Sequence, residues 1–260
     1  MLLLIDAGNT KVKWALVPAA VHDLATLGQW SASGAVEHAR IGELVELWRS
    51  YPVGRVLLAN VAGGAVREAL EQALAATLGL QPVPVDWFAS VAELAGVRNG
   101  YRNPAQLGCD RFAALIGARA LYPGQALVVA NCGTATTVDA LDADGAFAGG
   151  MILPGLGLMA AALATNTAQL PAVADYLDSL DVLGPFADHT EAAIASGCLA
   201  AQVGAIERAL AAQRRRQGDA VRCVLSGGAA GAIARHLSSP PQLVDNLVLI
   251  GLHTVVLTSC

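Results

Sequence analysis

The stretch that decides the fold is Met1-Leu-Leu-Leu-Ile-Asp6-Ala-Gly8-Asn9-Thr10-Lys11-Val-Lys13-Trp14. Two apolar runs flank Gly8 and Asn9, which tolerate the positive φ of a tight turn, so the pattern predicts a β-hairpin. Asp6 ends the first strand beside backbone amides, a hydroxyl and two lysines. Such groups can bind a polyphosphate, and the carboxylate can hold its Mg²⁺. The alternative interpretation is an ordinary hairpin with an aspartate at its turn.

The composition indicates a folded protein of 260 residues, because 55% of the residues are hydrophobic and only 14% are charged. A net charge of −5 argues against a general nucleic-acid binder. The five cysteines are scattered without a C-x-x-C pair, which favours reduced thiols over metal ligands or disulfides. No secretory signal is recognised, and we therefore expect a cytoplasmic protein. The apolar stretch 149–164 contains Pro154 and several glycines, so we predict a strand, a turn and a core helix there rather than a membrane helix.

Strand and helix patterns alternate along the chain, which predicts a layered α/β architecture. The strand-like runs are 2–6, 12–17, 56–59, 83–87, 127–130, 135–141, 150–153 and 221–225. The helical patterns are 36–49, 64–78, 104–121, 188–213, 229–236 and 246–257.

Three glycine-containing turns suggest a nucleotide site. Residues 127–139 repeat the opening pattern of strand, Gly-Thr turn and strand, and Gly227-Gly228 follows a third strand and opens a helix. Backbone N–H groups at such turns can approach phosphate closely. The P-loop, the G-x-G-x-x-G fingerprint and the G-x-S-x-G elbow are all missing from the sequence, which disfavours P-loop kinases, dinucleotide oxidoreductases and ordinary α/β-hydrolases.

A polar segment at 99–111 precedes a predicted helix with Asn103 as N-cap and Pro104 at its first position. Arg111 falls within the apolar stripe of that helix and Asp110 at its edge, so neither charge is simply solvated. One interpretation is a structural ion pair with groups elsewhere in the fold. The other is a general base at the floor of a cleft, because a partly buried carboxylate can have a raised pKa.

Thr190 is a further candidate. Asp188 and Glu191 stand three residues apart before an apolar-periodic helix, a pattern close to a capping box, so Thr190 is predicted in the first turn near unsatisfied amides. It could contact a polar ligand there, or it could be an ordinary first-turn threonine.

Taken together, these motifs resemble those of type III pantothenate kinases, members of the acetate and sugar kinase, chaperone and actin superfamily. The motifs are Asp6-x-Gly-Asn-Thr, Gly108-x-Asp110-Arg111, Gly133-Thr134-Ala-x-Thr-x-Asp139, Gly149-Gly-x-Ile152-x-Pro154-Gly155, Asn166-Thr167 and Thr190-x-x-Ala-Ile-x-x-Gly197. The resemblance implies an α/β fold of two ribonuclease-H-like (actin-like ATPase) lobes, 1–118 and 119–260, with a nucleotide cleft between them. It also implies a homodimer with the substrate pocket at its interface. The implied reaction is phosphorylation of pantothenate by ATP, the first step towards coenzyme A.

The resemblance also implies residue roles. ATP would be bound by Asp6, Ala7, Gly8, Asn9, Thr10, Lys11, Val12, Lys13 and Thr134, with Asp6 governing Mg²⁺. Pantothenate would be bound by Tyr101, Gly108, Cys109, Asp110, Arg111 and Thr190, with Asp110 as the general base. Phosphoryl transfer asks mainly for positioning and charge neutralisation, which this set can supply.

One position departs from the family pattern. An Asp that helps to hold an activating monovalent cation (K⁺ or NH₄⁺) is replaced here by Asn131. An amide offers an oxygen ligand without negative charge, so we expect weaker cation dependence. Two other functions stay open at this point: a non-catalytic regulatory accessory protein of the same fold, and a kinase for another small hydroxylated substrate.

Overall fold

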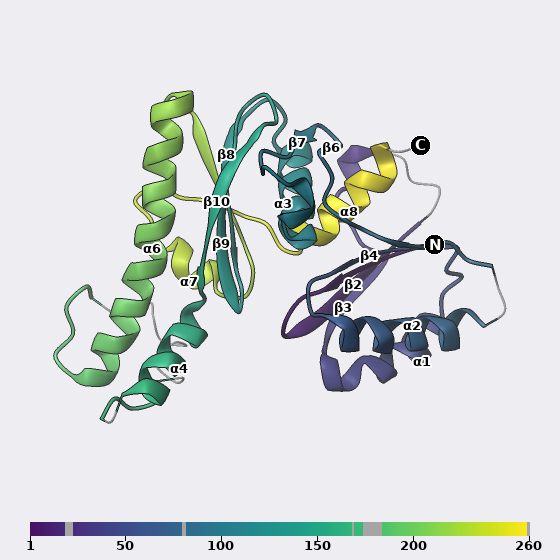
Figure 1. Ribbon diagram of the computed structural model, residues 1–260, viewed down its shortest axis with the longest axis horizontal. Helices are drawn as coiled ribbons and strands as arrows, with labels where there is room; N and C mark the ends of the chain where they lie inside the picture. Colours follow the sequence, from purple (N-terminus) through teal and green to yellow (C-terminus); the bar gives the residue numbers. More distant parts are fainter. Residues whose placement is uncertain (19–22, 80–81, 168, 174–183, 259–260) are drawn as a thin grey trace. The chain divides into compact units, whose positions relative to one another are not determined.

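The computed structural model of the protein describes residues 1–18, 23–79, 82–167, 169–173 and 184–258. The chain forms two compact units, one of Met1–Pro123 with Asn246–Cys260 and one of Gly124–Asp245. Each unit contains a five-stranded sheet covered by helices (Figure 1), so the predicted layered α/β architecture is confirmed.

The sheet of the first unit has the strand order β3-β2-β1-β4-β5. Its strands are β1 (Leu2–Ala7), β2 (Lys11–Val17), β3 (Ala32–Glu37), β4 (Arg55–Asn60) and β5 (Val85–Trp87). β1 pairs antiparallel with β2 and parallel with β4, so this central strand joins an antiparallel half of the sheet to a parallel half. The carboxyl ends of β1 and β4 consequently meet at one edge, where Ala7 is paired with Asn60.

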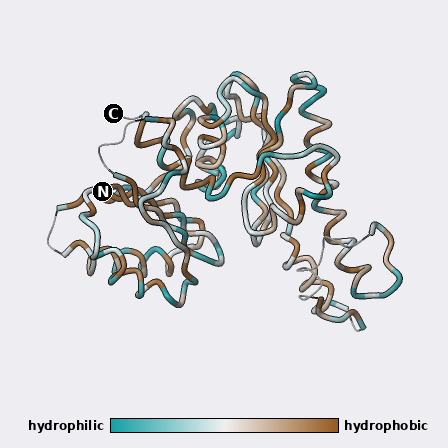
Figure 2. Tube along the Cα trace, turned by 180° about the vertical axis from the view of Figure 1, so that it is seen from behind, coloured by the Kyte–Doolittle hydropathy of each residue, from teal (hydrophilic) through white to brown (hydrophobic). Residues whose placement is uncertain are grey.

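Helices cover both faces of this sheet. α1 (Leu44–Arg49) and α2 (Gly64–Leu78) bury Trp48 and Leu70 in one cluster with Leu3 and Ile5. Successive strand residues point to opposite faces, so the buried Leu4 faces the other side, where α3 (Cys109–Leu121) and α8 (Leu247–Thr258) contact β1 and β4. Figure 2 shows the apolar character of α8, the helix next to the C-terminus.

The second unit repeats this topology with the order β10-β9-β8-β11-β12. Its strands are β8 (Ala126–Cys132), β9 (Ala135–Leu141), β10 (Phe147–Pro154), β11 (Val221–Ser226) and β12 (Gln242–Leu243). β8 pairs antiparallel with β9 and parallel with β11, as β1 does with β2 and β4. The repeat predicted from the two Gly-containing hairpins therefore extends to the whole sheet.

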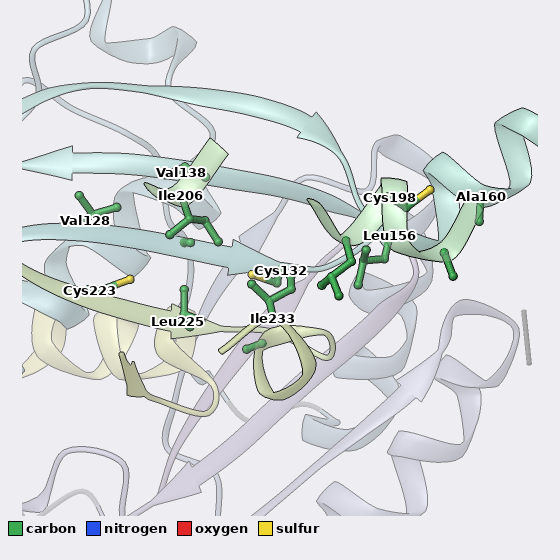
Figure 3. Close-up of a cluster of buried hydrophobic side chains, with 14 of the residues drawn as sticks. Val128, Cys132, Val138, Leu156, Ala160, Cys198, Ile206, Cys223, Leu225 and Ile233 are labelled. Atoms are coloured by element: carbon green, nitrogen blue, oxygen red, sulfur yellow. The ribbon is translucent and has the colours of Figure 1, made fainter. Parts of the chain in front are cut away.

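The core of the second unit lies between this sheet and three helices, α4 (Leu156–Asn166), α6 (Thr190–Gln217) and α7 (Ala230–Ala234). Figure 3 shows side chains from strands and helices meeting in it, among them Val128, Ile206, Leu225 and Ile233. The predicted strand, turn and helix over 149–164 are confirmed as β10 and α4. In the part of the chain that the structure describes, none of the helices combines the length and apolar character needed to cross a bilayer.

The compact units differ from the predicted division into 1–118 and 119–260. α8 ends the chain but belongs to the first unit, because it packs against α3. The two helices approach so closely that a Cβ on Gly251 would overlap the carbonyl oxygen of Ala113, and one on Gly117 would lie 2.7 Å from that of Leu247. Two glycines that look unremarkable in the sequence thus decide where the last helix packs.

Two predicted helices were wrong at their N-terminal ends. The helix predicted over 36–49 is a strand to Glu37, a 3₁₀ segment over His38–Glu43 and only then α1, because β3 pairs with β2 as an edge strand. The helix predicted from Pro104 is a separate 3₁₀ turn, Pro104–Gln106, capped by the Asn103 side chain, and α3 begins at Cys109. The short strands β6 (Glu93–Leu94) and β7 (Val97–Arg98) were not predicted.

Candidate active site

The opening hairpin forms as predicted. Gly8 N–H donates to the Lys11 carbonyl at 3.1 Å and closes the turn, and Asn9, Thr10 and Lys11 are exposed. Asp6, at the end of β1, is paired in register with Lys13 on β2. A carboxylate, a lysine and the exposed turn are therefore grouped at the edge where β1 and β4 end.

The N-terminus of α3 lies at the same edge. Cys109, its first residue, directs its thiol at the carbonyl oxygen of Asn60, the last residue of β4, with an S···O distance of 3.6 Å. Asp110 follows in the first turn of α3 and is close enough to Asp6 for its negative charge to raise the pKa of the Asp6 carboxyl group. The structure thus brings Asp6, Lys13, Cys109 and Asp110 together within the first unit.

The electrostatics of this group favour neutral acids. Burial raises the pKa of Asp6 to about 7, the negative charge of Asp110 adds to the rise, and Lys13 opposes it. Burial also raises the pKa of Asp110, against the lowering effects of the Arg111 backbone N–H and the Arg111 charge. Burial and the neighbouring Asp110 raise the pKa of the Cys109 thiol, so it is a poor nucleophile. Two carboxylates with raised pKa values in one place are typical of a functional site.

Gly108 makes room for the Asp110 carboxylate. Asp110 folds back so that its Oδ1 accepts a hydrogen bond of 2.8 Å from the Arg111 backbone N–H. In this position a Cβ on Gly108 would lie only 2.6 Å from Oδ1. The Gly-x-Asp spacing of the motif therefore has a steric reason.

Arg111 is buried, with 5% of its surface exposed, and its guanidinium donates to the Tyr101 hydroxyl at 2.9 Å. Its Cζ also lies 5.7 Å from the centre of the Tyr101 ring. Tyr101 is held in turn by its backbone N–H, which donates to the Asn99 side chain. The structure therefore links the predicted residues Tyr101 and Arg111 through a charge-assisted hydrogen bond.

Asn131 and Thr134 belong to the second unit, at the corresponding β8–β9 turn. The Thr134 carbonyl accepts from the Gly155 N–H at 2.9 Å, and a Cβ on Gly155 would overlap the Gly133 carbonyl oxygen. On the other side, a Cβ on Gly227 would lie 2.9 Å from Asn131 Oδ1. Two of the three glycine-containing turns predicted as a nucleotide site, those at Gly133 and Gly227, thus lie close together with Gly155 in the second unit. The third, at Gly8, belongs to the first unit.

Thr190 lies elsewhere in the second unit. It is the first residue of α6, as predicted, but the capping box is not formed, because His189 is the N-cap and makes no side-chain capping bond. Thr190 lines a groove of about 830 Å³ between α4 and α6 with mainly apolar walls that include Met159, Leu163 and Ile194.

Two further residues near these turns were missed by sequence reasoning. His38 Nε2 lies 2.8 Å from the Gly8 carbonyl oxygen. Gln202 is fully buried in α6 and donates to the Pro154 carbonyl at 2.7 Å, next to Gly155. A polar residue inside an apolar helix was the available signal for Gln202, whereas His38 carried none.

The described residues offer few side chains for binding a metal ion and no reactive thiolate. They contain no group of three or more His, Cys, Asp and Glu side chains able to hold a metal ion by themselves. Mg²⁺ commonly binds through one or two carboxylates, with water and substrate phosphates as its other ligands, and the Asp6 carboxylate fits that requirement. The cysteines in the described ranges are free thiols, and burial raises the pKa of Cys132 and Cys223 to about 12; Cys260 lies outside those ranges.

Two sheets of the same topology, each with a glycine-containing hairpin at the end of its central strand, define the duplicated fold of sugar kinases and actin-like ATPases. A protein from Campylobacter jejuni, provisionally described as a Baf family transcriptional activator, has this fold with a TM-score of 0.58 at 17% identity, over 99% of this chain and 98% of its own. A provisionally described 2-dehydro-3-deoxygalactonokinase from Sinorhizobium meliloti gives 0.55 at 15% identity, over 100% and 99%. At these identities the similarity shows the fold alone.

Sequence comparison defines the family. The family profile of type III pantothenate kinases matches residues 2–212. A type III pantothenate kinase from Janthinobacterium sp. (strain Marseille) is 62% identical over 258 residues, which cover 99% of this chain and 98% of that protein. The chain belongs to the type III pantothenate kinase family.

Proposed function

We propose that this protein transfers the γ-phosphoryl group of ATP to the primary hydroxyl of pantothenate and so forms 4'-phosphopantothenate for coenzyme A synthesis. Family membership supports the reaction. The observation that carries the site assignment is the grouping of Asp6, Lys13 and Asp110 where β1 and β4 end and α3 begins.

Asp110 is the proposed general base. It accepts the hydroxyl proton of pantothenate while the oxygen attacks the γ-phosphorus, and the bond from that phosphorus to the bridging oxygen of ADP breaks. A carboxylate whose pKa is raised by burial holds that proton better than a solvated one. Tyr101, Gly108, Cys109 and Arg111 would complete the pantothenate contacts on this side, with Arg111 already held by Tyr101.

The hairpin residues 6–13 and Thr134 are the proposed contacts to ATP. Lys11, Lys13 and the backbone of the turn would neutralise phosphate charge, which is the main demand of phosphoryl transfer. Asp6 would hold Mg²⁺, which supplies further neutralisation of the phosphates when it is bound.

Asn131 leads us to propose a weak dependence on monovalent cations. It offers an amide oxygen beside Gly227, without the charge that attracts K⁺. Activity should therefore rise less with added K⁺ than in the Asn131→Asp variant, when both are measured at constant ionic strength. Identical K⁺ activation curves for the two proteins would contradict this.

We further propose that the protein is a cytoplasmic homodimer with Thr190 in the substrate pocket at the interface. The groove between α4 and α6 supports this, because its walls are apolar and the side chains of Leu158 and Leu163 beside it are exposed. Exposed apolar surface of this kind marks interaction sites, and a symmetric dimer would cover it twice.

The deciding experiment measures ADP release and 4'-phosphopantothenate by mass spectrometry in the wild type and in Asp110→Asn. We expect ADP release to require pantothenate, and kcat to fall by about 10²–10⁴-fold in the variant, which is the usual contribution of a general base. Asp86→Asn, an exposed aspartate in the same unit, serves as the matched control and should keep its activity.

Two outcomes would contradict the proposal. Full activity of a folded Asp110→Asn protein would remove Asp110 as the base. Failure of the wild type to consume pantothenate with any of Na⁺, K⁺ or NH₄⁺ present would favour a regulatory protein or another kinase substrate.

A further inference from the structure

His38, a residue outside the β1–β2 hairpin, contacts the proposed phosphate-binding turn Gly8–Thr10. It is the first residue after β3, and because Glu37 is paired with Lys11 in the β2–β3 register, His38 lies level with the turn. Its Nε2 is 2.8 Å from the carbonyl oxygen of Gly8. The two residues are 30 positions apart, so only the packing of the edge strand β3 brings them together.

The donor and the acceptor of this hydrogen bond follow from the chemistry of the two groups. A carbonyl oxygen only accepts hydrogen bonds, so Nε2 carries the proton and donates it. Both backbone groups of Gly8 are then occupied, the N–H by Lys11 and the carbonyl by His38. The preceding carbonyl, that of Ala7, accepts from the Val61 N–H at 3.0 Å.

This arrangement matters for an anion. Carbonyl oxygens carry partial negative charge and repel phosphate, whereas N–H groups attract it. A turn that binds phosphate must therefore hold its carbonyls away from the ligand. The imidazole does this for Gly8, because its N–H engages the carbonyl oxygen in a hydrogen bond.

We propose that His38 is a positioning residue that pre-organises the Gly8–Thr10 turn for the phosphates of ATP. The inference rests on the proposed function, because it takes residues 6–13 as the ATP contacts. His38 acts through Gly8 and contacts neither the reacting hydroxyl nor the phosphorus. Pre-organisation of this kind lowers the ordering cost of binding, so its loss weakens ATP binding more than it slows the chemical step.

The test compares His38→Ala with His38→Gln. The glutamine side-chain amide can place an N–H close to the position of Nε2, whereas alanine removes the donor. Arg40→Ala is the matched control, because Arg40 lies in the same 3₁₀ segment and pairs with the exposed Glu43. Binding of adenylyl imidodiphosphate with Mg²⁺ is measured by calorimetry without pantothenate, and steady-state kinetics and thermal unfolding are measured in parallel.

We expect His38→Ala to raise the Kd of the analogue and the KM for ATP about five- to tenfold, the effect of one hydrogen bond. The KM for pantothenate and kcat at saturating ATP should stay within twofold of the wild type. His38→Gln should restore most of the affinity, and Arg40→Ala should bind like the wild type.

Several results would overturn the inference: unchanged analogue binding in His38→Ala, equal loss in His38→Gln and His38→Ala, or equal rises in both KM values. Absence of analogue binding to the wild type would also overturn it. If the wild type binds the analogue and responds to His38→Ala but does not phosphorylate pantothenate, the proposed function fails and the role of His38 stands. If pantothenate is phosphorylated and the His38 variants bind normally, the reverse holds.

Discussion

Asp6 and Asp110 show how burial gives two ordinary aspartates their chemistry. The pKa of a solvated aspartate lies well below neutral pH. The pKa of each of these two is raised, because the folded ends of β1 and α3 bury their carboxyl groups away from solvent. The sequence placed Asp6 correctly at the end of a strand, but it put Asp110 inside a helix predicted from Pro104, whereas Asp110 lies in the first turn of α3. Their mutual influence depends on which ends meet, and that is a tertiary property.

Gly108 offers a test of activity separated from stability. Its backbone angles, φ −54° and ψ 132°, suit any residue, so Gly108→Ala should leave the free energy of unfolding within about 0.5 kcal/mol of the wild type. The added methyl group lies 2.6 Å from Asp110 Oδ1 and must displace the carboxylate. We expect kcat for pantothenate phosphorylation to fall at least about tenfold, because misplacing a reacting group is costly. An active Gly108→Ala enzyme would show that the carboxylate position is not critical.

Asp6 predicts a pH dependence of stability. Its pKa is about 7 in the folded protein and near the ordinary aspartate value of 3.8 when unfolded, so the native state binds the extra proton between these values. The stability that this proton supplies is complete below pH 3.8 and is lost as the pH rises through 7. Asp6→Asn should therefore stabilise the protein more at pH 8 than at pH 5, as measured by urea unfolding. Equal stabilisation at both pH values would show that the Asp6 pKa is not raised.

Helices and strands with a clear buried face were predicted better than strands that depend on pairing at a sheet edge. The buried strands and the amphipathic α2 were predicted well, because hydrophobic periodicity reports burial. β3 was missed because Ala-Ser-Gly-Ala-Val-Glu has little strand propensity, and its pairing with β2 overrides that preference.

The contact between α3 and α8 provides a test at this scale. Gly251→Ala forces a methyl group into the Ala113 backbone, where neither helix can yield easily. We expect a loss of about 3 kcal/mol or more in the free energy of unfolding, at the upper end of the usual cost of overpacking.

Gly204→Ala in α6 is the matched control, because nothing lies within 4 Å of the added Cβ. Alanine is the better helix former, so this variant should be unchanged or stabilised by up to about 1 kcal/mol. Equal stability of the two variants, measured by denaturant unfolding, would refute the proposed role of the glycine contact.

For the whole molecule, the duplicated sheet topology explains why two hairpins recur in one chain. Each unit presents its turn at the end of its central strand, Gly8–Thr10 in one unit and Gly133–Thr134 in the other. The compact units do not follow the predicted lobes 1–118 and 119–260, because α8 packs with the first unit.

The proposed dimer makes a prediction at this scale. Leu163 is 37% exposed on the wall of the groove between α4 and α6, so Leu163→Glu should cost the monomer little. A buried, unpaired carboxylate at an interface is strongly unfavourable. We therefore expect sedimentation to show a dimer for the wild type and a shift towards monomer for the variant. Leu24→Glu, at an exposed leucine of the other unit, is the control and should sediment like the wild type. A wild-type monomer, or a variant dimer of unchanged affinity, would contradict the interface.

The α/β class, the hairpins, the motif residues and the resemblance to a kinase family can all be read from the amino-acid order, because strand periodicity, turn chemistry and motif spacing are local properties. The packing of α8 against α3, the space that Gly108 leaves for Asp110 and the contact of His38 with Gly8 became visible in the folded protein alone. These depend on contacts between residues far apart in the chain, and the space and hydrogen-bond partners that create them exist only after the sheets and helices have packed.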